Sequence, residues 1–339
     1  HIEKVEFIVN GQIVTQTFGK YIDIESELRQ TESRFRGFEK MTGKNQKNYF
    51  TTNTVRTLYL PLDFFFCRWG PDETRNMFPL FSLRLPWSIE VKFYIRPWVE
   101  CLRSNIDLAP ENYRESDTFC KVCLLCEHVY VSRPERLGYI STGELLIHQI
   151  QEQVEIIPEG KTDVKFELSA LRSAKACFFV FQDLQDLTRN AIFGNNPTGY
   201  HGWPPFRVDS YQRAIDDGSF PQPLRTAQFY LGNEEREPLS CKERQFFDSD
   251  MRADADFYRL VTHWRSSIRI PSKKYIYGYY FALNAWDMQP SGHYDMSQTS
   301  NFIRMRLMPG LNRTQVTFYV LGYNLLRFPG GDVDVVFID

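Results

Sequence analysis

Hydrophobic and polar positions alternate along several short segments of the first part of the chain, a pattern typical of β-strands with one buried face. Residues Val5 to Val14 alternate around Asn10-Gly11, and because this dipeptide readily adopts positive φ, the segment predicts a hairpin. Ser88 to Ile95 alternates cleanly, and Phe119 to Val131 is expected to form another strand.

The second part of the chain predicts a longer series of strands. Residues 132 to 144 are polar and contain proline and glycine, so a domain boundary is expected there. Beyond it, strands are expected at residues 145–157, 164–168, 176–181, 224–231, 275–286, 301–307, 314–321 and 333–338. Short strands in series indicate sandwiches or barrels rather than βαβ units.

Two segments interrupt this series as short helices. Acidic residues from Asp23 onward suit the first turn of a helix that would end at Gly37 or Gly43. Cys241 to Val261 is the other helix candidate, although its apolar spacing is irregular. The predicted fold class is therefore all-β with short helical insertions.

Composition adds weight to the β prediction and excludes some partners. Aromatic residues make up 15% of the chain, which favours pleated, half-buried surfaces. The formal net charge of −2 gives no reason to expect a specific nucleic acid as a partner. The seven cysteines are odd in number and most lie in apolar or alternating runs, which indicates buried thiols rather than a disulfide framework.

One cluster of residues could hold a metal on paper. Cys120, Cys123, Cys126 and His128 offer three thiols and an imidazole to Zn²⁺. If the segment is a strand, alternation places Cys123 on the face opposite the other three. A single strand cannot wrap all four around one ion, so these residues are weak candidates and no metal is expected.

Other chemistry-bearing motifs are sparse. The sequence holds no Gly-x-Ser-x-Gly elbow, no P-loop lysine motif and no His-Glu-x-x-His helix, so neither a catalytic residue nor a cofactor is expected. Asn312 begins an Asn-Arg-Thr sequon and is a candidate glycosylation site of low weight.

The segment from Tyr277 to Asn301, YGYYFALNAWDMQPSGHYDMSQTSN, resembles the late signature of the major capsid proteins of nucleocytoplasmic large DNA viruses. That signature is a "YSFAL" strand, a "QPSG" turn, and a serine and an asparagine at set distances. The matching positions here are Gln289, Pro290, Ser291, Gly292, Ser297 and Asn301. A strand followed by a Pro-Gly turn suits such a sequence.

Two earlier blocks carry the same resemblance in the family's order. Leu58 to Ile95 contains LPLDFFFCRWG, which is similar to the family's "PLPFWFCR". Val5 to Gly43 contains NGQ, YIDIESEL and GFEKMTG, similar to "IGGQ", "WLDIWNEL" and "GYDKMIG". The matched positions in the former block include Pro61, Phe64, Phe66, Cys67 and Arg68.

The resemblance implies two consecutive jelly rolls, each an antiparallel β-sandwich, with residues 1–138 in the first and 139–339 in the second. The family has strands ahead of the NGQ hairpin, so the first jelly roll is expected to lack its opening strands. By resemblance, three copies form a trimer of pseudo-hexagonal outline that tiles an icosahedral virion, and no enzyme activity is expected.

The expected partners follow from the same resemblance. They are two further copies of the chain, neighbouring capsomers, minor capsid and penton proteins, and an internal viral membrane. The expected location is the capsid of the virion, after synthesis in the host cytoplasm. A minor capsid or scaffolding protein, a jelly-roll carbohydrate-binding module and a metal-dependent β-barrel enzyme remain as alternatives.

Overall fold

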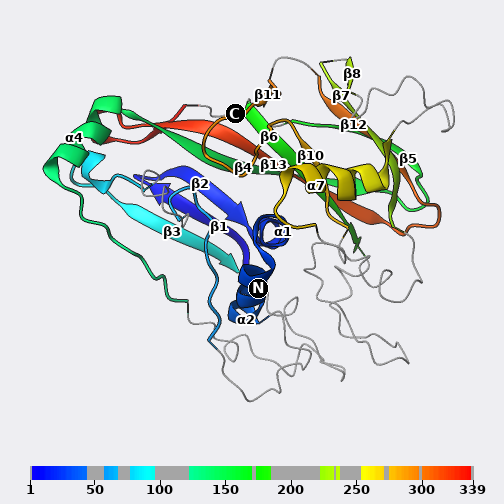
Figure 1. The fold of residues 1–339 in the computed structure, drawn as a ribbon, viewed down its shortest axis with the longest axis horizontal. Coiled ribbons are helices and arrows are strands. Elements are labelled where there is room, and N and C mark those ends of the chain that lie inside the picture. The colour runs from blue at the N-terminus through cyan, green and yellow to red at the C-terminus, as the bar shows by residue number, and fades with distance from the viewer. Residues whose placement is uncertain are drawn as a thin grey trace.

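The computed structural model describes residues 2–43, 57–67, 77–95, 122–169, 173–184, 222–232, 234–236, 253–270, 275–297 and 300–336. Most regular structure in these ranges is β-strand, in three antiparallel sheets with a few short helices (Figure 1). The all-β expectation is therefore confirmed. Among the described residues, no helix combines the length and apolarity needed to cross a membrane.

Two sheets face each other to form a β-sandwich in the second part of the chain. The first contains β4 (Glu144–Ile157), β6 (Ser173–Asp183), β10 (Tyr277–Tyr280), β11 (Tyr294–Asp295), β13 (Thr314–Arg327) and β14 (Asp334–Val335). The second contains β5 (Asp163–Glu167), β7 (Leu224–Leu231), β8 (Glu234–Arg236), β9 (Ala253–Asp254) and β12 (Phe302–Leu307). Aromatic and aliphatic side chains from both inner faces form one buried core, which is the arrangement of a jelly roll.

The central strand β6 is buried on both faces. Phe179 and Phe181 point into the sandwich, whereas Phe178 and Val180 point to the opposite face of the sheet. On that opposite face lies α1 (Gly19–Arg29), which contributes Tyr21 and other buried side chains. Because both faces are covered, residues 176–181 of this strand form a continuous apolar run rather than an alternating one.

The third sheet is built from the beginning of the described chain. Its strands are β1 (Ile2–Val9), β2 (Gln12–Phe18) and β3 (Ile89–Ile95), in the order β2-β1-β3. Asn10 and Gly11 link β1 to β2 with φ of 50° and 84°, so the predicted hairpin is confirmed. Figure 1 shows this small sheet beside the half of β4 and β13 that lies farther from β5 and β12, and the two parts share a buried cluster.

Two helices follow the hairpin where the sequence predicted one. After α1, a second helix α2 (Glu32–Thr42) begins, and it ends at Gly43 with φ of 76°. Glycine reaches this left-handed conformation without a Cβ clash and is common at helix ends. The break between α1 and α2 at Gln30 and Thr31 has extended backbone, so the single predicted helix is wrong.

One expectation beside the proposed boundary is also wrong. Residues 122–131, expected as part of the strand Phe119 to Val131, have no regular secondary structure, because no described strand pairs with them, and residues 119–121 lie outside the described ranges. The polar stretch after them is a helix, α4 (Arg133–Thr142), whose capping box joins Ser132 and Glu135.

Several later elements differ in extent from their predictions, and β13 extends six residues beyond the predicted 314–321. Of the helix predicted at Cys241 to Val261, residues 241–252 lie outside the described ranges. The remainder is strand β9 and a π-helical turn η5 (Phe257–Val261), which leads into α7 (Thr262–Ser266). The Asp254 carboxylate accepts a hydrogen bond from the Phe257 amide at 3.0 Å, so the helix begins only there. Strand β10 is shorter than the predicted 275–286, and β14 covers only two residues of 333–338.

Candidate functional site

The loop of residues 281–292, here called the motif loop, follows β10 and carries the QPSG turn. Ser291 closes it, because its hydroxyl accepts from the Asn284 amide at 2.8 Å and donates to the Asn284 carbonyl at 3.0 Å. The Leu283 amide donates to the Ser291 carbonyl at 3.3 Å. Gly292 has φ of 128°, which side-chain-bearing residues rarely adopt, so the turn requires glycine there.

Beneath the motif loop lies Lys175, a fully buried lysine on β6. Its ammonium donates to the Asp287 carbonyl at 2.7 Å and lies 2.8 Å from the His148 Nε2 atom. The same group sits 4.3 Å from the ring centre of Tyr323. Tyr323 in turn donates its hydroxyl to the Gln289 carbonyl at 3.4 Å. The loop that carries the signature residues is thus held from below by the sheet.

Asn301, the last residue of the signature, joins three other segments of the chain. Its buried side chain accepts from the Gly232 amide at 3.1 Å and from the Tyr294 hydroxyl at 3.3 Å. Its amide nitrogen donates to the Met296 carbonyl at 2.9 Å, and its own carbonyl accepts from Leu168 at 2.9 Å. An asparagine suits this position because it offers a donor and an acceptor together.

We expect Asn301→Ala to lower the free energy of unfolding by about 2 kcal/mol, because the Gly232 amide and the Met296 carbonyl would lose a buried partner. Urea unfolding followed by circular dichroism measures this difference. The matched control is Ser297→Ala, because Ser297 is exposed and its hydroxyl donates to the Asp295 carboxylate, and a change within about 0.5 kcal/mol is expected there. Equal effects of the two substitutions would contradict the role given to Asn301.

The matched residues of the LPLDFFFCRWG block support the small sheet instead. Phe64 is buried, and the Phe66 ring packs on Phe64 and Phe7 with centroid distances of 5.4 and 4.6 Å. Burial raises the pKa of the Cys67 thiol to about 11, so it stays protonated at neutral pH. Pro61 is exposed in a stretch without regular structure, and Arg68 lies outside the described residues.

The structure does not assemble the candidate metal ligands. Cys123, Cys126 and His128 are exposed on residues 122–131, and Cys120 lies outside the described ranges. In the part of the chain that the structure describes, no group of three His, Cys, Asp or Glu side chains could hold a metal ion. The sequence argument against a metal assumed that this segment is a strand. Residues 122–131 are not a strand in the structure.

Asn312 lies in the turn between β12 and β13. The hydroxyl of Thr314, the third residue of the sequon, is directed back to the Asn312 carbonyl at 2.8 Å, and Thr314 is buried. Glycosylation of Asn312 stays a prediction.

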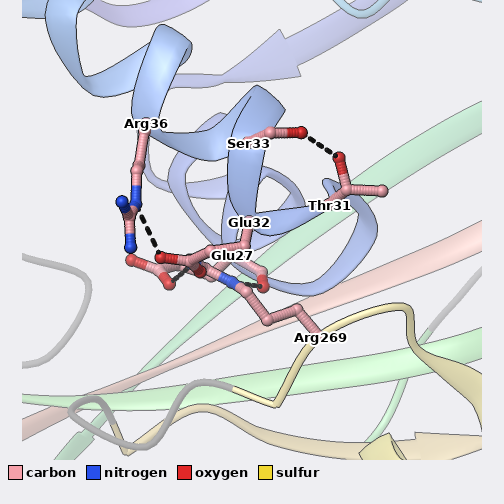
Figure 2. A network of polar contacts seen from close by, with 6 residues as sticks. All are labelled: Glu27, Thr31, Glu32, Ser33, Arg36 and Arg269. Carbon is pink, nitrogen blue, oxygen red and sulfur yellow. Dashed lines mark hydrogen bonds and ion pairs between the residues drawn. The ribbon is translucent and has the colours of Figure 1, made fainter.

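A second polar site joins the helices to the sandwich. We call Arg269, Glu27, Glu32 and Phe35 the Arg269 clamp. Figure 2 shows the Arg269 guanidinium between the carboxylates of Glu27 and Glu32, and it also donates to the Glu27 carbonyl at 3.0 Å. Its cationic centre lies 3.4 Å from the ring centre of Phe35. The pKa of the Glu32 carboxyl is lowered by hydrogen bonds from Arg269 and Arg36.

Sequence reasoning missed both Lys175 and Arg269. Lys175 had a signal, because a lysine between two alanines in an otherwise apolar strand must find buried partners. Arg269 had none, because its partners Glu27 and Glu32 are 242 and 237 positions away along the chain. No periodicity in the sequence links such distant residues.

The jelly-roll sandwich with the small sheet beside it is similar in fold to solved double jelly-roll capsid proteins. The protein resembles PBCV-1 VP54, solved as a crystal structure fitted into a cryo-EM reconstruction of the virophage Sputnik. The TM-score is 0.68 at 16% identity, over 100% of this chain and 84% of that one. The Faustovirus major capsid protein matches with a TM-score of 0.64 at 14% identity, over 96% and 71% of the two chains.

Comparison of sequences gives the family. The family model for the N-terminus of the major capsid protein matches residues 1–131, and the model for the large eukaryotic DNA virus major capsid protein matches residues 139–332. The chain belongs to this major capsid protein family. The major capsid protein of Phaeocystis pouchetii virus is 22% identical over 97% of this chain and 79% of its own length. That of Pyramimonas orientalis virus is 23% identical over 97% and 74%.

Proposed function

We propose that this chain is the shell-forming subunit of a large DNA virus, that three copies form a capsomer of pseudo-hexagonal outline, and that these capsomers tile an icosahedral virion. The observation that carries the proposal is the ordered match of two major capsid family models to both halves of the chain. The role is structural and needs no cofactor, since the homologues are structural proteins and no enzymatic family is indicated.

The architecture supports a role that depends on shape. A sandwich whose central strand β6 is buried on both faces is a rigid scaffold, and loops on a rigid scaffold commonly carry contacts with partners. The partners in this proposal are further copies of the chain, neighbouring capsomers, minor capsid and penton proteins, and an internal membrane. The chain is made in the host cytoplasm and its location is the virion.

The proposal includes the division into residues 1–138 and 139–339. It is supported by the gap between the two family-model matches, which end at residue 131 and begin at residue 139. It is also supported by strand membership, because every strand of the two sandwich sheets follows residue 143, and every strand of the small sheet precedes residue 96.

The native mass in solution tests the proposal. Light scattering at several protein concentrations is expected to give three times the chain mass of 40.0 kDa, independent of concentration. Electron microscopy of concentrated samples would then be expected to show flat lattices. A stable monomer at all concentrations would overturn the capsomer proposal.

A further inference from the structure

His263 is a fully buried histidine on α7 with both ring nitrogens engaged. Its Nε2 atom lies 3.0 Å from the Ile276 carbonyl, which can only accept, so Nε2 carries the hydrogen. Its Nδ1 atom, 2.9 Å from the Tyr280 hydroxyl, is then the acceptor in the neutral ring. The Ser267 hydroxyl also meets the Tyr280 hydroxyl, so a chain of hydroxyls donates toward Nδ1. If Nδ1 also takes up a proton, the two hydroxyls must reverse the direction in which they donate.

The surroundings of the ring are apolar. Phe178 of β6 stacks against it, with ring centres 6.4 Å apart, and a Cβ at Gly278 would lie only 2.7 Å from its Cε1 atom. The described side chains that contact the ring come from β6, β10 and α7. Among them Tyr280 is the titratable group, and none carries a charge. A charged imidazolium has no counter-ion among these contacts, so burial lowers the pKa of His263 to about 4.

The helix that holds His263 leads directly to the Arg269 clamp. The Ser267 amide ends α7 by donating to the His263 carbonyl at 2.8 Å. The next two amides, Ile268 and Arg269, both donate to the Leu28 carbonyl of α1, at 2.9 and 3.1 Å. The position of α7 therefore determines where Arg269 meets α1 and α2.

We propose that His263 is an acid-sensitive latch: protonation of its ring loosens α7 and the Arg269 clamp, and so increases the opening of the α1–α2 layer while the sandwich stays closed. The ring binds a proton more tightly when it is exposed, because an exposed histidine has its ordinary pKa of 6.5. Stability from the neutral buried ring is therefore complete above pH 6.5 and is lost as the pH falls toward 4. Hydrogen bonds from Arg269 and Arg36 lower the pKa of the Glu32 carboxyl, so it takes up a proton at lower pH than an ordinary glutamate. The latch does not depend on the proposed capsomer.

Hydrogen–deuterium exchange of the full chain at pH 7.5 and 4.5, corrected for the intrinsic exchange rates, tests the latch. Linkage predicts that opening of residues 19–42 and 262–269 increases by about 70-fold between these pH values, with a much smaller change in β6 and β13. In His263→Gln the increase is expected to fall below about threefold, because the amide keeps both hydrogen bonds but does not titrate. The control His293→Gln replaces an exposed histidine and should retain the full response.

Two results would overturn the latch. One is an unchanged pH response in His263→Gln, and the other is an equal rise of opening in β6 and β13. If His263→Gln does not fold, the test is instead an NMR pH titration of the unmodified protein labelled with carbon-13 histidine. An imidazole signal that titrates near pH 4 together with the opening of α1 and α2 supports the latch, whereas six rings that all titrate near pH 6.5 overturn it.

Discussion

Replacing Phe179 with alanine is expected to lower the free energy of unfolding by about 4 kcal/mol. Phe179 is fully buried between the two sandwich sheets. Its ring stacks on Tyr277 with a centroid distance of 5.3 Å, and lies 5.8 Å from Phe318 and 6.4 Å from Phe229. Tyr277 and Phe318 belong to the same sheet as Phe179, whereas Phe229 belongs to the facing sheet. The truncation therefore opens a cavity that neither sheet can fill alone.

Urea unfolding, followed by circular dichroism at equal protein concentrations, measures this loss. The control is Tyr130→Ala, which truncates an aromatic side chain that is 93% exposed, and a change within about 0.5 kcal/mol is expected. A loss below about 1.5 kcal/mol in Phe179→Ala would show that the sandwich core collapses around the gap, contrary to the packing described.

Replacing Arg269 with methionine is expected to lower the free energy of unfolding by about 3 kcal/mol, because it leaves the Glu27 carboxylate buried without its guanidinium partner. The Glu27 side chain is 8% exposed, so water cannot replace the lost partner fully. The pairing with Glu32 adds little to this figure, because that carboxylate is 59% exposed. The same urea experiment measures the effect.

Two matched variants test the reason for this loss. In the double variant Arg269→Met with Glu27→Gln, most of the loss should be recovered, because no buried charge then lacks a partner. Arg36→Met also removes a cation from Glu32, but that pair is exposed on both sides, so a change within about 0.5 kcal/mol is expected. An equal loss in Arg36→Met and Arg269→Met would contradict the role of burial.

Local chemistry was enough to predict several elements. The hairpin at Asn10-Gly11 depends on two adjacent residues that tolerate positive φ, and β7 matches its predicted bounds, residues 224–231. A readable local signal was also passed over: Ser132 and Glu135 form a capping box, yet no helix was predicted there.

Other elements depended on partners that the local pattern does not contain. Residues 122–131 have the apolar residues of a strand, but a strand exists only where another strand accepts its main-chain hydrogen bonds. The predicted strand at 275–286 stops at Tyr280 because the next two amides both turn to the Lys175 carbonyl. Neither outcome follows from hydrophobic periodicity.

The sequence by itself determined the all-β class, most strands of the sandwich and, through ordered motifs, the capsid family. It also located the signature residues Ser291 and Asn301, although not what they contact. Only the tertiary structure decided that Lys175 supports the motif loop, that Arg269 holds the two helices and that His263 is buried against the Phe178 and Tyr280 rings. The physical reason is that strand and turn preferences act between neighbouring residues, whereas burial and charge pairing depend on which distant segments the fold brings together.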